Sequence, residues 1–259
     1  MFNALASNEK PMLNLIMPVY NDGPLVIPTI STLAFTIKYP TNLIVVYDSE
    51  EDSTIPIIKK MQVIFPGIRL IRNEQMKGVL NAIKTGFKNA DAPYVGIWIC
   101  YQVDPFGIIN QMMEKMLEGY DFVTTSRFIY KGHFSRGSII KRELSKIANK
   151  LLTIFTGVPL TDATSSIKVY KKNFLDATLI ETKMSGGWAV SLELALKALV
   201  KGLKYFEIPL EKKNMSLLHG VSHFSVKTQL REYLRWFFYG VSNRKVINRK
   251  FRENQVIEK

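Results

Sequence analysis

The chain has 259 residues, with 35 Lys and Arg against 22 Asp and Glu, and its formal net charge is +13. Hydrophobic residues make up 47% and charged residues 22%, which excludes a disordered chain, a collagen-like repeat and a disulfide scaffold. The longest apolar runs, such as 94–101, are too short to form a membrane-spanning helix. Because the N-terminus lacks signal-peptide features and Cys100 is the single cysteine, we expect a cytoplasmic protein.

The positive charge is concentrated toward the C-terminus. Residues 201–259 hold 13 of the basic and 5 of the acidic side chains, so this segment alone carries a net charge of +8. Such asymmetry favours an anionic partner, and a solvated lysine-rich surface is the alternative. The sequence contains no nucleic-acid-binding motif, and we expect no nucleic-acid partner.

Strand-like and helix-like segments alternate over the first half of the chain. Short apolar runs predict strands, and the stretches between them have helical patterning or turn residues. We expect strands over 13–19, 43–47, 68–71, 94–100 and 122–125, and helices over 24–38, 54–64, 76–87 and 105–117. This alternation predicts an α/β fold with a mostly parallel sheet between helices, in which ligands bind beyond the carboxyl ends of the strands.

Longer helices are predicted for the second half of the chain. Helical spacing of apolar residues predicts helices over 139–155, 186–200 and 226–241, with a strand over 205–209. We expect a main domain over residues 1–225 and an amphipathic basic helix and tail over 226–259, with the segment beyond Ser242 frayed.

The predicted helix 226–241 combines an apolar face with a basic stripe. Lys227, Arg231 and Arg235 follow one another at four-residue spacing beside the apolar residues, and Trp236 and Tyr239 flank them. One interpretation places this helix in a membrane interface, with the two aromatic residues at headgroup level. The other is an ordinary amphipathic helix packed on the domain.

Three short motifs follow one another along the chain: residues 17–22 (MPVYND), 45–54 (VVYDSEEDST) and 126–128 (SRF). In this order they resemble the PxYNE, VDDGSxDxT and SR(Y/F) elements of the family 2 glycosyltransferases with a GT-A fold. Residues 157–170 (GVPLTDATSSIKVY) also match, and the resemblance spans about residues 12–240. The most similar branch is that of the dolichyl-phosphate mannose synthase-like enzymes.

This resemblance implies a Rossmann-like GT-A domain that moves a hexose from a GDP- or UDP-sugar to a polyprenyl or dolichyl phosphate. The implied nucleotide-binding residues are Pro18, Tyr20, Asp22, Asp48 and Lys77. Asp48 follows a buried strand, and the alternative to a nucleotide ligand there is a turn residue that caps the next helix. Lys77 precedes a helix N-terminus, which suits a diphosphate.

A second set of residues is implied for the acceptor phosphate. It consists of Ser126, Arg127, Lys141 and Ser145, of which the last two are one helical turn apart. A guanidinium binds phosphate in a fork, so Arg127 is also a catalytic candidate. For Lys141 the alternative is a solvated charge on a helix.

The segment that fits the family worst is its metal-binding Asp-x-Asp, which holds Mg²⁺ or Mn²⁺ on the diphosphate. Here residues 99–103 read ICYQV and contain no carboxylate. Divalent cations of this kind prefer carboxylate oxygens. Asp104 is the remaining catalytic and metal-ligand candidate, with Gln102 beside it. Mg²⁺ or Mn²⁺ therefore stays a candidate cofactor, and the missing carboxylates count against it.

Two interpretations of function therefore stay open. The chain is a divergent inverting glycosyltransferase, or an inactive paralogue that binds a nucleotide, a lipid phosphate or a partner subunit. The transferase is favoured because the chain retains the residues that the resemblance assigns to phosphate binding, among them Lys77, Arg127 and Lys141. We expect a protein peripheral to the inner membrane face, with an anionic membrane surface and a membrane-embedded partner subunit as candidate partners.

Overall fold

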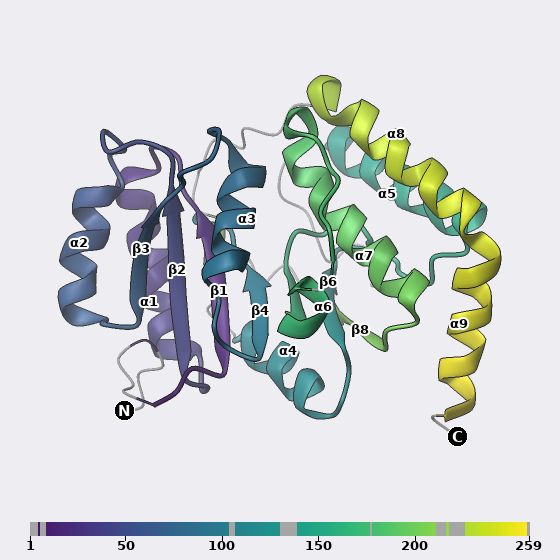
Figure 1. Ribbon diagram of the computed structural model, residues 1–259, viewed down its shortest axis with the longest axis horizontal. Helices are drawn as coiled ribbons and strands as arrows, with labels where there is room; N and C mark the ends of the chain where they lie inside the picture. Colours follow the sequence, from purple (N-terminus) through teal and green to yellow (C-terminus); the bar gives the residue numbers. More distant parts are fainter. Residues whose placement is uncertain are drawn as a thin grey trace.

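A computed structural model (Figure 1) describes residues 5, 9–103, 107–129, 139–176, 178–210, 216–217 and 226–257. Its elements in chain order are β1 (Leu13–Pro18), η1 (Gly23–Leu25), α1 (Val26–Thr36), β2 (Thr41–Tyr47), α2 (Ile55–Ile64), β3 (Ile68–Arg72), α3 (Val79–Asn89), β4 (Tyr94–Ile97), β5 (Gln102–Val103), α4 (Ile108–Leu117), β6 (Phe122–Ser126), α5 (Ile139–Thr156), β7 (Lys168–Lys171), α6 (Lys172–Asp176), η2 (Met184–Ala189), α7 (Val190–Lys201), β8 (Tyr205–Pro209), β9 (Ser216–Leu217), α8 (Val226–Ser242) and α9 (Arg244–Ile257).

Seven strands form one mixed sheet in the order β3-β2-β1-β4-β7-β6-β8. The pairs β1–β2, β2–β3, β1–β4 and β6–β8 are parallel, whereas β7 runs antiparallel to both of its neighbours. The predicted α/β fold with a mostly parallel sheet is thus confirmed. The strand β7 was not predicted, because its sequence, KVYK, has no apolar run to mark it.

Helices cover both faces of the sheet, and the strand sequences explain why. Along β1, Leu13, Leu15 and Met17 lie in one buried cluster and Ile16 in the other, as the two-residue period of a strand requires. Helices α1, α2 and α4 contribute to the first cluster, and α3 and α7 to the second. Figure 1 shows α1 behind the sheet and α3 in front of it.

The C-terminal helices pack against the domain. Trp236 of α8 is 1% exposed, lies in the second cluster, and donates from Nε1 to Thr182 Oγ1 at 2.9 Å. The expectation of Trp236 at membrane headgroups was therefore wrong, and helix packing is confirmed. The expected fraying beyond Ser242 was also wrong, because α9 is a regular helix whose Ile247 is buried. Of the helices described, none is long and apolar enough to cross a bilayer.

Trp236→Ala will lower the free energy of unfolding by about 3–5 kcal/mol, since it leaves a large cavity in a packed core. The matched control on the same helix is Phe238→Ala, because Phe238 is 61% exposed and its loss will change stability by about 0.5 kcal/mol or less. Urea denaturation of both variants measures the difference. Equal losses would contradict the packing of α8.

Candidate functional site

The carboxyl ends of four strands meet at one edge of the sheet. Strands β1, β2 and β4 are mutually parallel, and β6 shares their direction because β4 and β6 are both antiparallel to β7. Pro18 ends β1, Tyr20 and Asp22 follow it, and Asp48 follows β2. Lys77 lies between β3 and α3, and Arg127 follows β6. The topology therefore brings both predicted sets to the edge where ligands bind in open α/β sheets.

The turn after β1 is fixed by side chains that follow β2. The Asn21 N–H donates to Asp52 Oδ2 at 3.0 Å, and the Asp22 N–H donates to Thr54 Oγ1 at 3.0 Å. Asn21 has φ 53°, in the left-handed region. This brace leaves Tyr20 57% exposed and Asp22 half-buried at the edge of the sheet.

Asp48 joins the end of β2 to the start of α3. Its Oδ1 accepts from Asn73 Nδ2 and its Oδ2 accepts from the Gly78 N–H, each at 2.7 Å. Gly78 has φ 126°, which only glycine adopts without strain, and it is the N-cap of α3. Asp48 thus anchors the N-cap residue of α3 and makes no side-chain capping bond to α3 or to α2, the helix that follows it. It positions the turn that carries the exposed Lys77.

The position of the family's metal site is occupied by buried neutral groups. Cys100 is 4% exposed and Gln102 is 2% exposed. Burial, together with the nearby Asp22 carboxylate that accepts from the thiol, raises the pKa of Cys100. The described residues contain no group of three or more His, Cys, Asp or Glu that suits a metal ion. The described residues at this position do not fit a hard divalent cation. Asp104 lies outside the described residues.

Arg127 forms a buried bidentate ion pair with Asp162. Arg127 Nε donates to Asp162 Oδ2 at 2.6 Å, and Nη2 donates to Oδ1 at 2.8 Å. The Asp162 side chain is fully buried, and that of Arg127 is 28% exposed. Such fork geometry fixes the guanidinium plane. Among the described residues Nη1 has no hydrogen-bond partner.

The same guanidinium reaches α5, as the predicted acceptor set requires. Arg127 Nη2 lies 3.3 Å from Ser145 Oγ and 3.0 Å from Thr164 Oγ1. Ser126, by contrast, is 1% exposed, and its hydroxyl bonds to Thr161 Oγ1 at 2.5 Å. The side chain of Lys141 lies outside the described residues.

Buried charges around Arg127 shift one another's titration. Burial raises the pKa of Asp162, but the charge and hydrogen bonds of Arg127 outweigh it, and the net pKa is below the ordinary value. Burial lowers the pKa of the neighbouring Lys168 to about 7. For Glu207, which accepts from the Thr161 and Asp162 N–H groups, burial raises the pKa.

Sequence reasoning assigned no role to Asp162, although it lies in the matching run 157–170. The available signal was a carboxylate within the short polar stretch TDATSS, between apolar segments. Burial of this stretch leaves the Asp162 charge in need of compensation, and Arg127 provides it.

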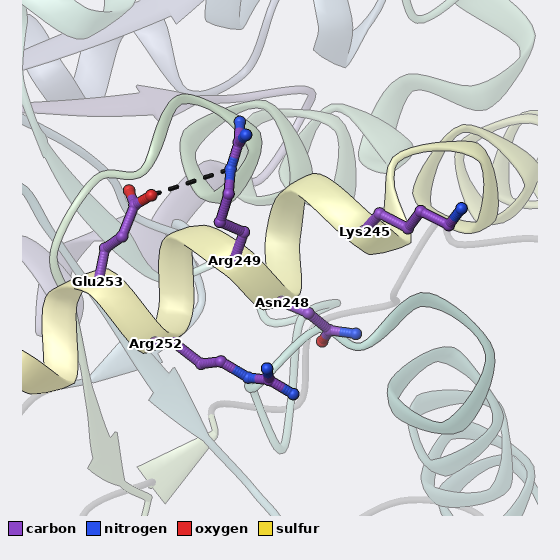
Figure 2. Close-up of a pocket in the computed structure, with 5 residues that line it drawn as sticks. All are labelled: Lys245, Asn248, Arg249, Arg252 and Glu253. Carbon is purple, nitrogen blue, oxygen red and sulfur yellow. Dashed lines mark ion pairs between the residues drawn. The ribbon is translucent and has the colours of Figure 1, made fainter.

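A shallow surface hollow of about 480 Å³ lies apart from these residues, on α9 (Figure 2). It is lined by Lys245, Asn248, Arg249, Arg252 and Glu253, with Arg249 Nε 3.8 Å from Glu253 Oε1. None of these residues was predicted as part of a site. They form an exposed, basic helix surface.

Comparison with known proteins decides the family. The model of the family described as "Glycosyl transferase family 2" matches residues 14–179. The chain belongs to glycosyl transferase family 2. The resemblance inferred from the motifs is thereby confirmed, and the edge of the sheet described above is the edge of a glycosyltransferase domain.

Curated relatives of this glycosyltransferase chain include two undecaprenyl-phosphate 4-deoxy-4-formamido-L-arabinose transferases. The one from Aeromonas hydrophila is 24% identical over 180 residues, which cover 67% of this chain and 53% of the relative. The one from Klebsiella pneumoniae is 23% identical over 171 residues, 64% of this chain and 51% of the relative. The chain thus spans about half the length of these relatives.

Solved structures confirm the fold of the glycosyltransferase chain. Glucosyl-3-phosphoglycerate synthase from Mycobacterium tuberculosis, in complex with phosphoglyceric acid, superposes with a TM-score of 0.67 at 15% identity, over 90% of this chain and 80% of that one. The same enzyme with Mn²⁺, UDP and phosphoglyceric acid gives 0.66 at 14% identity, over 89% and 78%. At these identities the likeness shows the GT-A fold alone.

Asp162→Asn will lower the free energy of unfolding by about 3–5 kcal/mol near neutral pH, because it leaves the Arg127 charge buried without a partner. The pKa of Asp162 is lower in the folded than in the unfolded chain, so the stabilisation is present above the unfolded pKa and is lost as pH falls through the folded one. Acid denaturation curves of the wild type should include this loss, and those of the variant should lack it.

The control is Asp91→Asn, which removes the partner of the more exposed Arg69. We expect a loss of about 0.2–1 kcal/mol there. A cost for Asp162→Asn no larger than that of the control would contradict the buried pair.

Proposed function

We propose that the chain transfers a hexose from a nucleotide sugar to a polyprenyl phosphate. The observation that carries this proposal is the pairing of Arg127 with Ser145 at 3.3 Å. The two residues are distant in sequence and come from different elements, and they were predicted together as ligands of the acceptor phosphate. The curated relatives named above carry undecaprenyl phosphate in their names, which supports a lipid phosphate as the acceptor.

In this proposal Arg127 holds the acceptor phosphate through Nη1, which has no hydrogen-bond partner in the described part of the chain. Asp162 already uses Nε and one side of Nη2, so the guanidinium does not need to reorganise when phosphate binds. Ser145 adds a hydroxyl beside the same group, and Lys141, four residues earlier on α5, is the third proposed ligand. Ser126 supports this site from within, through its bond to Thr161.

The nucleotide sugar is proposed to bind at the ends of β1 and β2. Asp48 and Asp22 hold the nucleoside, with Pro18 and Tyr20 at the same turn, and Lys77 neutralises the diphosphate. The exposed position of Lys77, next to the N-terminus of α3, supports this assignment, because helix N-termini and cations together favour phosphate groups.

The reaction that follows is a direct displacement. An oxygen of the lipid phosphate attacks the anomeric carbon, the bond from that carbon to the diphosphate oxygen breaks, and the configuration inverts. The acceptor phosphate is ionised near neutral pH, so no strong general base is required. Asp104 is proposed at the leaving-group end, and the enzyme is proposed to act as a peripheral protein at the cytoplasmic membrane face.

A second candidate function is binding without transfer. It is favoured by the run 99–103, where the family's carboxylates are absent and Cys100 is buried as a neutral thiol. In that case the two phosphate sites persist in a paralogue that binds nucleotide, lipid phosphate or a membrane-embedded partner subunit. Activity and nucleotide binding, measured together, separate the two candidates.

The proposed transfer is tested by incubating the protein with labelled UDP- and GDP-hexoses and polyprenyl phosphate, and extracting the lipid product. We expect Arg127→Gln to reduce product formation by about 100-fold, as loss of a charge-stabilising donor typically does. The matched control is Arg69→Gln, which should keep full activity. Arg69 also pairs with an aspartate, but it lies near the amino end of β3, away from the proposed site. Nucleotide binding without product from any donor would favour the binding paralogue.

Lys77→Gln will weaken binding of UDP or GDP about tenfold and leave binding of the free nucleoside unchanged, because Lys77 interacts with phosphate alone. Lys88→Gln, at the other end of α3, is the matched control and should bind as the wild type does. Titration calorimetry in EDTA and in Mn²⁺ should give the same affinity within about twofold, since the described residues do not fit a metal. A strong requirement for Mn²⁺ would contradict this assignment.

A further inference from the structure

The two long helices beside the proposed acceptor site expose an extended apolar surface. Its side chains are between 38% and 61% exposed, and we call them the α5–α8 apolar face. On α5 they are Leu144, Ile147, Leu151, Ile154 and Phe155, and on α8 they are Leu230, Leu234, Phe238 and Val241. Contiguous apolar surfaces of this kind mark interaction sites rather than ordinary protein surface.

Both helices are firmly held, so this exposure is not the result of a loose helix. Figure 1 shows α5 and α8 side by side, and the rings of Phe155 and Phe237 are in edge contact at 5.9 Å. The opposite face of α5 buries Asn149 and Leu152, and that of α8 buries Trp236. Each helix therefore has one apolar side in the core and a second that is open to the surroundings.

Positive charge flanks the α5–α8 apolar face. Helix α5 has four basic residues and one acidic residue, and α8 has three and one. Lys146 and Lys150 are exposed on α5, and helical spacing places them away from Phe155 and hence from α8. Arg231 is exposed on α8. An apolar strip with cationic borders matches the interface of an anionic bilayer, where acyl chains meet acidic headgroups.

We propose that the α5–α8 apolar face is the surface by which this protein lies on an anionic lipid membrane. This inference rests on the proposed function and deepens it by fixing where the membrane is. Ser145 is adjacent in sequence to Leu144 of the face and lies 3.3 Å from Arg127. A polyprenyl phosphate thus keeps its chain in the bilayer while its phosphate reaches Arg127.

Charge argues for a bilayer over a second copy of the chain on this face. A symmetric dimer would place the cationic borders of two chains together, each chain with a net charge of +13. Like charges brought together in this way oppose association, whereas acidic headgroups neutralise them. The basic α9, which follows α8 directly, adds to the same positive field.

Vesicle flotation tests the proposal with the full chain. Vesicles of phosphatidylcholine with about 30% phosphatidylglycerol contain neither polyprenyl phosphate nor nucleotide sugar, so the result does not depend on catalysis. We expect the wild type to float with these vesicles, and Leu151→Ser/Phe238→Ser to partition at least about tenfold less, because two apolar anchors are removed without a change in charge. Thermal melting confirms that the variant is folded.

The matched control is Val63→Ser/Ile64→Ser on α2, where the two residues are 86% and 65% exposed but lie outside the face. It should float as the wild type does. Lys146→Gln/Lys150→Gln should weaken binding to anionic vesicles and leave the small binding to pure phosphatidylcholine unchanged.

Three outcomes would overturn the proposal. They are a wild type that does not float at low salt, an apolar variant that floats equally, and a wild-type dimer in sedimentation that the apolar variant converts to monomer without any vesicle binding. The transferase assay tests the proposed reaction independently of flotation. An inactive protein that still floats through this face retains the membrane surface and loses only the assigned reaction.

Discussion

The candidate site depends on the buried ion pair between Arg127 and Asp162. Breaking a buried ion pair leaves an uncompensated charge, so the pair fixes both segments of the chain that carry it. Asp162 is in turn held by Glu207 of β8, which accepts from its backbone N–H at 3.1 Å. Three segments distant in sequence therefore meet near one guanidinium. They are the end of β6, the run before β7 and strand β8, and Ser145 joins them from α5.

The opposite end of the site is built on a different principle. There the carboxylates of Asp48 and Asp52 accept from backbone N–H groups and hold the turns after β1 and β2. No described cation pairs with Asp48, and Lys77, which precedes the Gly78 that Asp48 holds, is exposed. At one end Arg127 pairs with the Asp162 carboxylate, and at the other end Lys77 lies on a turn that the Asp48 carboxylate holds through N–H donors. With no carboxylate in residues 99–103, the exposed Lys77 is the cation at this end of the edge that the proposal assigns to the diphosphate.

The sequence predicted what depends on local pattern, and it failed where the outcome depends on tertiary partners. Apolar runs located β1, β2, β3, β4 and β6, but β7 was missed because Lys168 is buried there only by virtue of its acceptors, among them the Ser191 hydroxyl. Motif order identified Arg127 and Ser145 and their proximity. It gave no role to Asp162, because burial of a carboxylate is not visible in a polar run. Trp236 was assigned to the wrong face, since its contact with Thr182 crosses 54 residues of chain.

Helix α5 shows why an apolar stripe alone does not reveal which way it faces. Its sequence carries apolar residues on more than a third of its circumference, and helical spacing puts Asn149 about a third of a turn or more from Leu151 and Phe155. The polar side chain of Asn149 is buried because it donates to Thr164 Oγ1 at 3.1 Å, beside the ion pair. With Asn149 on the buried side, Leu144, Ile147 and Leu151 lie on the exposed side of the helix. The hydrogen bond of Asn149 thus ties α5 to the Arg127–Asp162 network on one side, while Leu151 and Phe155 are exposed on another, so the proposed acceptor site and the proposed membrane surface share this helix.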